Sequence, residues 1–396
     1  MSSTFSPQAL FTGILAAFVG FASSFPVVLR GLSAVGATPQ QAASGLMALS
    51  LAMGVLAILL SLKSRMPISI AWSTPGAALL FTAGIQPGGF KAAVGAFIVT
   101  SLLIILAGLW KPLGRWVAAI PTPLANAMLA GVLLEFCLAP VNAVAEQPIL
   151  ALAIILTWVI VAKINRLFAV PAAVLVTIVL IATTTHLAPG AMDHVLPDPV
   201  LVMPAFSWQA MIGIALPLFI VTMASQNVPG IAVLNVNGYR PDPGPLFRDT
   251  GIFSLLTAPF GGHGVNLAAI TAALCAGPDA HPDPARRYWA AVVAGITYLL
   301  FGVLATAATA FISASPPILI EAVAGLALLG SFGSAMAGAV ASPAEREAAV
   351  ITFVITAASS VANVKFFGIS GAFWGLVAGG LVLALTRWQV RKKPQP

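Results

Sequence analysis

The sequence contains few charged residues. Asp, Glu, Lys and Arg make up 7% of its 396 residues, whereas hydrophobic residues make up 59%. A soluble domain carries about 25% charged residues. With a mean hydropathy of +1.01, this chain cannot bury its apolar side chains in one core and keep a wetted surface. The composition therefore excludes soluble globular, disordered and collagen-like classes, and it predicts an all-α protein that crosses a membrane many times.

Cysteines and catalytic motifs are also scarce. The two cysteines, Cys137 and Cys275, lie in separate apolar runs, which fits neither a disulfide framework nor a metal site. The sequence has no P-loop and no GxSxG, HExxH or CxxC motif. These absences argue against ATP-driven transport and against a membrane hydrolase or redox enzyme. We predict no cofactor, no metal site and no catalytic residues.

The basic residues carry topological information. The net charge is +7, but the Lys and Arg residues are scattered at the ends of apolar runs, which is typical of membrane topology and not of a nucleic-acid interface. None of them precedes Arg30. The N-terminus therefore lacks the positive region of a cleaved signal peptide, and the first apolar segment is predicted to stay as a membrane helix.

Charges, prolines and glycine clusters divide the chain into about 14 apolar segments that can cross the bilayer. With both termini in the cytoplasm, only Arg30, Lys91 and Lys365 among the 18 basic residues fall in outer loops, which agrees with the positive-inside rule. The predicted spans are 9–31, 39–62, 67–83, 89–110, 119–138, 147–164 and 168–187 in the first half, and 206–229, 244–258, 262–276, 286–312, 316–339, 346–363 and 367–388 in the second.

Weak internal repetition relates the two halves. Pro123–Gly131 aligns with Pro317–Gly325 at an offset of 194, and Ala83-Gly84 aligns with Ala276-Gly277 at an offset of 193. Because each half then holds an odd number of spans, the second half must be inverted across the membrane. Inverted repeats are typical of secondary transporters.

The two shortest spans, the third and the tenth, are interrupted at corresponding places by the segments Ile70–Gly76 and Pro259–Asn266. Such paired breaks indicate a transporter binding site. Pro75 suits the first turn of a half-helix, with Ser73 or Thr74 as its cap, and Asn266 is predicted to cap the other half-helix. Two helix N-termini meeting near the midplane favour an anion. The alternative is a pair of ordinary kinked helices with packing glycines.

Three other features suggest binding residues. Gln226 and Asn227 precede a Pro-Gly break, and their amides can donate to a carboxylate, although polar residues also join helices in membranes. Phe25, beside Pro26, is a candidate ring contact or an ordinary core residue. The row Gly371, Gly375 and Gly379 predicts close helix packing, within one chain or across a dimer.

Few ionisable residues lie inside the predicted spans, and such residues are functional candidates. Glu135 and Glu321 occur in the fifth and twelfth spans. Either is a candidate proton carrier or a cap near an interface. His263 titrates near neutrality in water and neighbours the proposed site, as a candidate for proton transfer or as a neutral hydrogen-bond partner.

Four segments resemble the benzoate/proton symporter (BenE) family: Phe25–Leu29, Trp72–Gly76, Ala224–Gly230 and Ala258–Thr271. The resemblance covers essentially the whole chain, and His-Gly-Val-Asn at 263–266 is its most specific part. It implies a seven-plus-seven inverted-repeat fold shared with nucleobase and anion transporters, and a common homodimer. It also implies a core domain of residues 1–110 and 200–313, and a gate domain of residues 111–190 and 314–390.

One difference from the wider superfamily is informative. Nucleobase transporters carry a glutamate in the eighth span about where Gln226 stands, and another in the tenth, where this chain has no acid. A neutral amide suits an anionic substrate, because like charges repel in a low dielectric. The same difference leaves no acidic side chain at that point of the eighth span to carry the proton.

The resulting hypothesis is a multi-pass symporter of the bacterial cytoplasmic membrane that imports benzoate or a similar aromatic carboxylate with a proton. A nucleobase or inorganic-anion transporter of the same fold is the alternative, and a channel or a membrane enzyme belongs to other classes. The predicted partners are the substrate, H⁺, the lipid bilayer and a second copy of the chain, without nucleic acid. The predicted substrate-binding residues are Phe25, Ser73, Thr74, Pro75, Gln226, Asn227, Phe260, His263, Gly264, Val265 and Asn266.

Overall fold

A computed structural model describes residues 6–22, 24–110, 112, 121–184, 198–268, 270–278, 280–314, 316–362, 364, 366 and 371–392. Lys365, the domain boundaries at 111 and 190, and the parts of the predicted spans that fall in these gaps lie outside the described residues.

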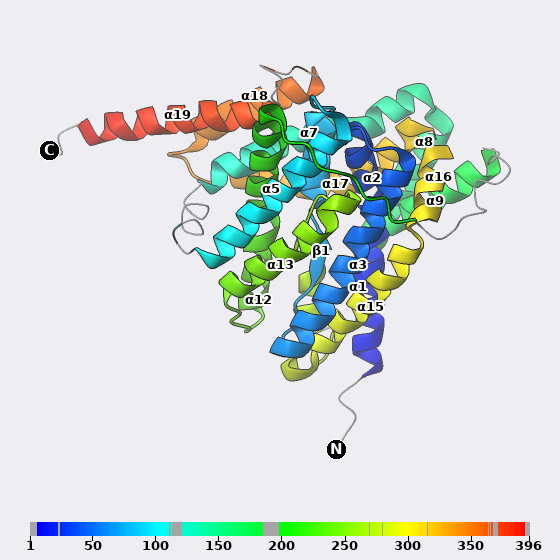
Figure 1. The fold of residues 1–396 in the computed structure, drawn as a ribbon. Coiled ribbons are helices and arrows are strands. Elements are labelled where there is room, and N and C mark those ends of the chain that lie inside the picture. The colour runs from blue at the N-terminus through cyan, green and yellow to red at the C-terminus, as the bar shows by residue number, and fades with distance from the viewer. Residues whose placement is uncertain are drawn as a thin grey trace.

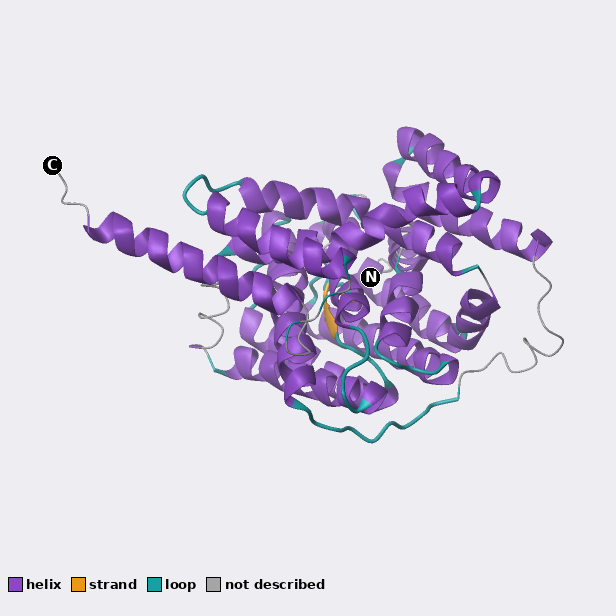
Figure 2. Cartoon of the chain, turned by 90° about the horizontal axis from the view of Figure 1, so that it is seen from above, coloured by secondary structure: helices purple, strands orange, loops and turns teal. Residues whose placement is uncertain are grey.

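Helices make up most of the described chain (Figures 1 and 2). The first half contains α1 (Pro7–Ala22), α2 (Phe25–Ala34), α3 (Pro39–Ser64), α4 (Thr74–Ala83), α5 (Gly89–Leu109), α7 (Thr122–Glu146), α8 (Pro148–Ile164) and α9 (Ala169–Thr184). The second contains α10 (Trp208–Ala210), α11 (Leu216–Thr222), α12 (Val228–Val236), α13 (Pro243–Thr257), α14 (Ile270–Ala276), α15 (Tyr288–Val303), α16 (Ala305–Ala314), α17 (Pro317–Val340), α18 (Arg346–Val361) and α19 (Gly371–Lys392). The prediction of a mainly helical chain is confirmed.

Seven helical stretches among the described residues are long and apolar enough to cross a bilayer. Three apolar helices, α4, α8 and α9, are shorter, with 10–17 residues each. These lengths support a multi-pass architecture, whereas the count of 14 spans stays a prediction. The long stretches are Pro7–Ala34, Pro39–Ser64, Gly89–Leu109, Thr122–Glu146, Trp208–Val236, Pro317–Val340 and Gly371–Trp388.

The stretch Trp208–Val236 is one helix with two wider π-helical turns, Met211–Ala215 and Met223–Asn227. Each wide turn lies just before a proline, Pro217 or Pro229. A proline ring clashes with the carbonyl four residues earlier and supplies no N–H, and a π-helical turn relieves this conflict. The second of these π-helical turns contains the predicted site residues Gln226 and Asn227.

Two short strands lie near the centre of the helical bundle (Figure 2). β1 (Ile70–Trp72) and β2 (Val265–Leu267) pair antiparallel, with Ala71 opposite Asn266. Each strand leads into a short helix, α4 or α14. The sequence predicts the two breaks, and pairing explains why they are extended: unpaired backbone groups are costly in hydrocarbon, and each strand supplies the partners for the other.

Glycines bring the helices into backbone contact. A Cβ on Gly54 of α3 would lie 2.6 Å from the carbonyl oxygen of Gly295 on α15, and the reverse substitution would give 2.7 Å. Along α19, the row Gly371, Gly375 and Gly379 packs against the side chains of α18. This row is therefore a packing surface within the chain, which is one of its two predicted roles.

Candidate functional site

A central cavity lies where the two broken segments meet. Its volume is about 80 Å³, and it is bordered by α1, α3, β1, α4, the second π-helical turn, α14, α15 and α17. Among the described residues that line it, none is charged. The lining residues are Val19, Gly20, Ser24, Met53, Ala71, Trp72, Thr74, Pro75, Gln226, Ala268, Thr271, Tyr298, Ala327, Leu328 and Ser331.

The N-terminus of α4 borders this cavity through Thr74 and Pro75. Ser73 caps the helix, since its Oγ accepts a hydrogen bond from the Gly76 N–H at 3.1 Å, as the sequence predicts for Ser73 or Thr74. Thr222 Oγ1 donates to the same Ser73 Oγ at 2.9 Å, which ties α11 to the cap. The end of a helix that carries free N–H groups is electropositive. The cavity therefore adjoins a dipole that favours negative charge.

The other predicted cap has a different role. Asn266 lies inside β2, four residues before the start of α14, so the prediction that it caps this half-helix is wrong. It is fully buried. With its amide oriented to satisfy both neighbours, its oxygen accepts from the Ser73 N–H and its nitrogen donates to the Leu267 carbonyl, each at 2.9 Å. Asn266 is part of a strand because β2 pairs with β1, a long-range contact that the local sequence does not reveal.

His263 connects the loop before β2 to the cap of α4. Its Nε2 donates to the Ser73 carbonyl at 2.9 Å, its ring meets Phe97 edge-on, and 1% of the residue is exposed. Gly264, the next residue, has a φ of +136°, a conformation that glycine adopts readily. Neither residue, nor Val265 of β2, is among those that line the cavity.

The side chains of Gln226 and Asn227, adjacent in the sequence, have different roles. Gln226 lines the cavity. Asn227 is fully buried, and its Oδ1 accepts from the Leu267 N–H at 2.9 Å while its Nδ2 donates to Met223 Sδ at 3.2 Å. Asn227 thus joins the second π-helical turn to β2. This matches the alternative role given above, in which a polar residue joins two segments inside the membrane.

The predicted ring contacts lie away from the cavity. Phe25 borders a separate apolar cavity of about 380 Å³, formed mainly by α1, α9, α15 and α16. Phe21 stands between the two cavities, with its ring centroid 5.4 Å from those of Phe25 and Trp72. Phe260 lies in a short 3₁₀ turn, and its carbonyl accepts from Ser44 Oγ at 3.0 Å.

The two glutamates share a third cavity. Glu135 and Glu321 line about 100 Å³ of space between α7, α17 and the end of α4, together with Asn142 and Phe81. Glu321 forms an ion pair with Arg30 of α2, whose guanidinium also lies 5.8 Å from the centre of the Phe81 ring. Lone charges in two apolar runs are the sequence signal for such a pair, although the sequence does not show that they are partners.

Sequence reasoning missed several polar residues of the central cavity. Trp72 Nε1 donates to Ser24 Oγ at 2.8 Å, and that hydroxyl donates to the Gly20 carbonyl at 2.8 Å. Tyr298 and Thr271 also line the cavity. Only 3 tyrosines occur in the chain, so one in the middle of an apolar run is a signal that could have directed attention to Tyr298.

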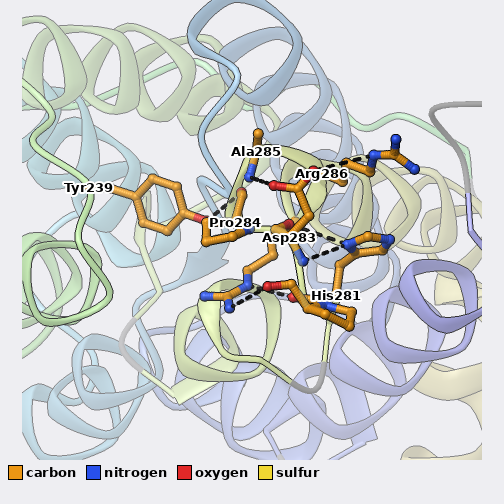
Figure 3. A network of polar contacts seen from close by, with 8 residues as sticks. Tyr239, His281, Asp283, Pro284, Ala285 and Arg286 are labelled. Atoms are coloured by element: carbon orange, nitrogen blue, oxygen red, sulfur yellow. Dashed lines mark hydrogen bonds and ion pairs between the residues drawn. The ribbon is translucent and has the colours of Figure 1, made fainter.

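A polar network fixes the far end of α14 (Figure 3). The buried Arg287 donates to the carbonyls of Ala276 at 2.8 Å and His281 at 2.7 Å. Tyr239, from the connection after α12, donates to the Pro284 carbonyl at 2.8 Å. Burial raises the pKa of Tyr239, an effect that the neighbouring Arg287 opposes. The network therefore holds α14, which follows β2, from the side away from the cavity.

Comparison with known proteins identifies the family. The model of the family described as "Benzoate membrane transport protein" (BenE) matches residues 3–385. The chain belongs to this family. It is accordingly a membrane transporter and not an enzyme, and the resemblance seen in the sequence is confirmed.

Individual relatives agree with this assignment. The chain is 42% identical to the "Inner membrane protein YdcO" of Escherichia coli over 375 residues, covering 95% of both chains. It is 30% identical to the "Benzoate membrane transport protein" of Acinetobacter baylyi over 382 residues, covering 96% of this chain and 95% of the relative.

Solved structures of distant sequence show the same fold. SLC26A9 superimposes with a TM-score of 0.62 at 14% identity, covering 96% of this chain and 65% of that one; a second structure, of the murine Slc26a9 anion transporter, also gives a TM-score of 0.62. The transmembrane domain of the cyanobacterial bicarbonate transporter BicA gives a TM-score of 0.56 at 15% identity and covers 96% of both chains.

Proposed function

We propose that this protein imports benzoate or a closely similar aromatic carboxylate across the bacterial cytoplasmic membrane, coupled to protons, by alternating access. The observation that carries the proposal is an uncharged, largely apolar cavity that holds a few polar groups at the N-terminus of α4. Membership of the benzoate transporter family supports the choice of substrate.

The cavity suits a carboxylate bound by neutral donors. Thr74 and the N-terminus of α4 lie on one part of its wall, and Gln226 supplies an amide that can donate. No lining carboxylate among the described residues repels the substrate. The apolar side chains Val19, Met53 and Leu328 provide surface for the ring. Ser73 and Asn227 act by holding the cap and β2 in place.

Alternating access requires a site between two bodies that move relative to each other. We place the boundary between a core domain, residues 1–110 and 200–313, and a gate domain, residues 111–190 and 314–390. The cavity supports this division because α17 contributes Ala327, Leu328 and Ser331 to a wall that otherwise comes from core elements. The proposal includes two inverted seven-span repeats, cytoplasmic termini and a homodimer.

Proton coupling would make import of a monoanion electroneutral, avoiding about 2.3 kcal/mol per charge for each 100 mV of opposing potential. Among His263, Glu135 and Glu321, we favour Glu135. It forms no ion pair with a described residue, whereas Glu321 is paired with Arg30 and the His263 ring donates to Ser73. Glu135 also lies beside Glu321 in the third cavity, between α7 and α17.

The decisive experiment measures uptake of labelled benzoate into proteoliposomes under an inward proton gradient, with protein-free liposomes as the control because benzoic acid also crosses lipid unaided. We expect saturable uptake that collapses with a protonophore. Gln226→Ala removes one hydrogen bond to a charged group, worth about 1.5–3 kcal/mol, so KM should rise at least about tenfold.

Competition tests the alternative of the same fold. Excess sulfate, bicarbonate or uracil should leave benzoate uptake unchanged. Benzoate uptake no greater than in protein-free liposomes, together with protein-dependent uptake of labelled bicarbonate, would identify an inorganic-anion transporter, the activity named for the structural neighbour BicA.

A further inference from the structure

Tyr298 lines the central cavity, and its buried hydroxyl has no hydrogen-bond partner among the described residues. Tyr298 is on α15, 1% of the residue is exposed, and it lines the cavity. Its Oη lies near Thr271 but forms no hydrogen bond of normal geometry with any described residue. Buried hydroxyls nearly always have a partner, because leaving one unpaired costs free energy. An unpaired donor at a binding cavity indicates that a ligand group completes it.

The residues around Tyr298 offer its hydroxyl no other hydrogen-bond partner among the described residues. Thr271 Oγ1 is paired with Ser69 Oγ at 3.0 Å, and no described residue forms a hydrogen bond with the Tyr298 Oη. On the other side, the hydroxyl packs against the backbone of α1 at Gly20, where an added Cβ would overlap it. One turn before Tyr298, Gly295 is in close contact with Gly54 of α3, so α15 has little room to carry the ring away from the cavity.

We propose that Tyr298 determines specificity for a carboxylate by donating its phenolic hydrogen to the substrate. This inference rests on the proposed function and adds a donor from α15, on the same cavity as Gln226 and the N-terminus of α4. A phenol is neutral, so it introduces no charge into the cavity. Because the hydroxyl has already lost water on folding, the bond to an anionic oxygen is gained without a further desolvation cost on the protein side.

The first test is Tyr298→Phe, with equilibrium binding of labelled benzoate to the purified full-length protein and thermal unfolding as the two readouts. The substitution removes one oxygen and keeps the ring. We expect the Kd for benzoate to rise at least about tenfold, the effect of one hydrogen bond to a charged group. The unfolding temperature should stay the same, since no protein bond is lost.

Tyr288→Phe is the matched control on the same helix. Tyr288 is buried too, but its hydroxyl accepts a hydrogen bond from Arg65 Nη1. Loss of that hydroxyl should lower the unfolding temperature and leave the Kd for benzoate unchanged. The pair of variants therefore separates a structural hydroxyl from a ligand-binding one.

Gly20→Ala supplies a second test. The added Cβ would overlap the Tyr298 hydroxyl and would next meet Thr271 Cγ2 at 3.1 Å. The single variant should be less stable. The double variant Gly20→Ala/Tyr298→Phe should recover stability, because the overlapping oxygen is gone, and should still bind benzoate at least about tenfold more weakly than the natural protein.

The outcomes distinguish the two proposals. If the natural protein shows no saturable binding of benzoate, the proposed substrate is wrong. If it binds benzoate and Tyr298→Phe binds equally well, the role of Tyr298 is refuted and the proposed function stands. A drop in unfolding temperature for Tyr298→Phe as large as that for Tyr288→Phe would also refute it, by showing that the hydroxyl has a structural partner.

Discussion

Asn227 tests the difference between a substrate ligand and a structural connection. The sequence predicts that its amide binds the substrate, whereas the structure occupies both ends of that amide, with Leu267 N–H and Met223 Sδ. We therefore expect Asn227→Ala to act first on stability. Substrate binding should weaken only as far as β2 loses its position.

The size of the effect follows from the Leu267 N–H. This group lies in β2, and 1% of the residue is exposed, so the group has no access to water when the Asn227 oxygen is removed. A buried donor left unpaired costs about 1–3 kcal/mol. The free energy of unfolding should therefore fall by about this amount, which changes the ratio of folded to unfolded protein by roughly 5- to 150-fold.

Reversible unfolding in mixed detergent micelles measures this loss. Asn237→Ala is the matched control, because among the described residues the Asn237 amide donates only to the Val233 carbonyl, one turn earlier in the same helix, at 2.9 Å. Its effect should stay within about 0.5 kcal/mol. The reasoning fails if Asn227→Ala is as stable as the control variant yet no longer binds benzoate, since the amide would then be a ligand, as the sequence indicates.

Three further predictions concern an ion pair, glycine packing and a hydrogen bond. Charge reversal at either member of the Arg30–Glu321 ion pair should reduce both transport and stability. The exchanged pair Arg30→Glu/Glu321→Arg should restore both, with a coupling free energy of about 1–3 kcal/mol in a double-mutant cycle. Independent effects of the two substitutions would contradict the ion pair. Gly31→Ala would force a Cβ onto the Ala77 carbonyl and should lower the free energy of unfolding by about 1–3 kcal/mol in the same assay. Gly380→Ala is its control: no atom lies within 4 Å of the added Cβ, so the substitution should raise the free energy of unfolding by about 0.5–1 kcal/mol. Tyr239→Phe should lower the free energy of unfolding by about 0.5–1.5 kcal/mol through loss of its bond to Pro284, and an unchanged value would show that the bond contributes nothing.

Local features of the site could be predicted from the sequence. The break around Pro75 and the cap at Ser73 depend on residues within one turn of each other, and both are confirmed. The second π-helical turn accompanies Pro229. Such features follow from backbone geometry, which neighbouring residues determine.

Long-range partners could not be predicted in this way. Asn227 and Leu267 are 40 residues apart in the chain, and Ser69 and Thr271 are 202 apart. Hydropathy and spacing show that a polar residue lies within a span, but they do not show which other span it faces. Asn266 illustrates the consequence, because its residue type suits a helix cap and only the pairing with β1 reveals that it lies in a strand.

The pairing of β1 with β2 also constrains how the protein is made. β1 leaves the ribosome nearly 200 residues before β2, a delay of about 10–40 s at a synthesis rate of roughly 5–20 residues per second. During that interval the N–H and C=O groups of Ile70–Trp72 have no strand partner, and lipid cannot provide one. We expect the first half to stay close to water or to the insertion machinery until β2 arrives, so that the binding cavity forms in a late step of membrane insertion.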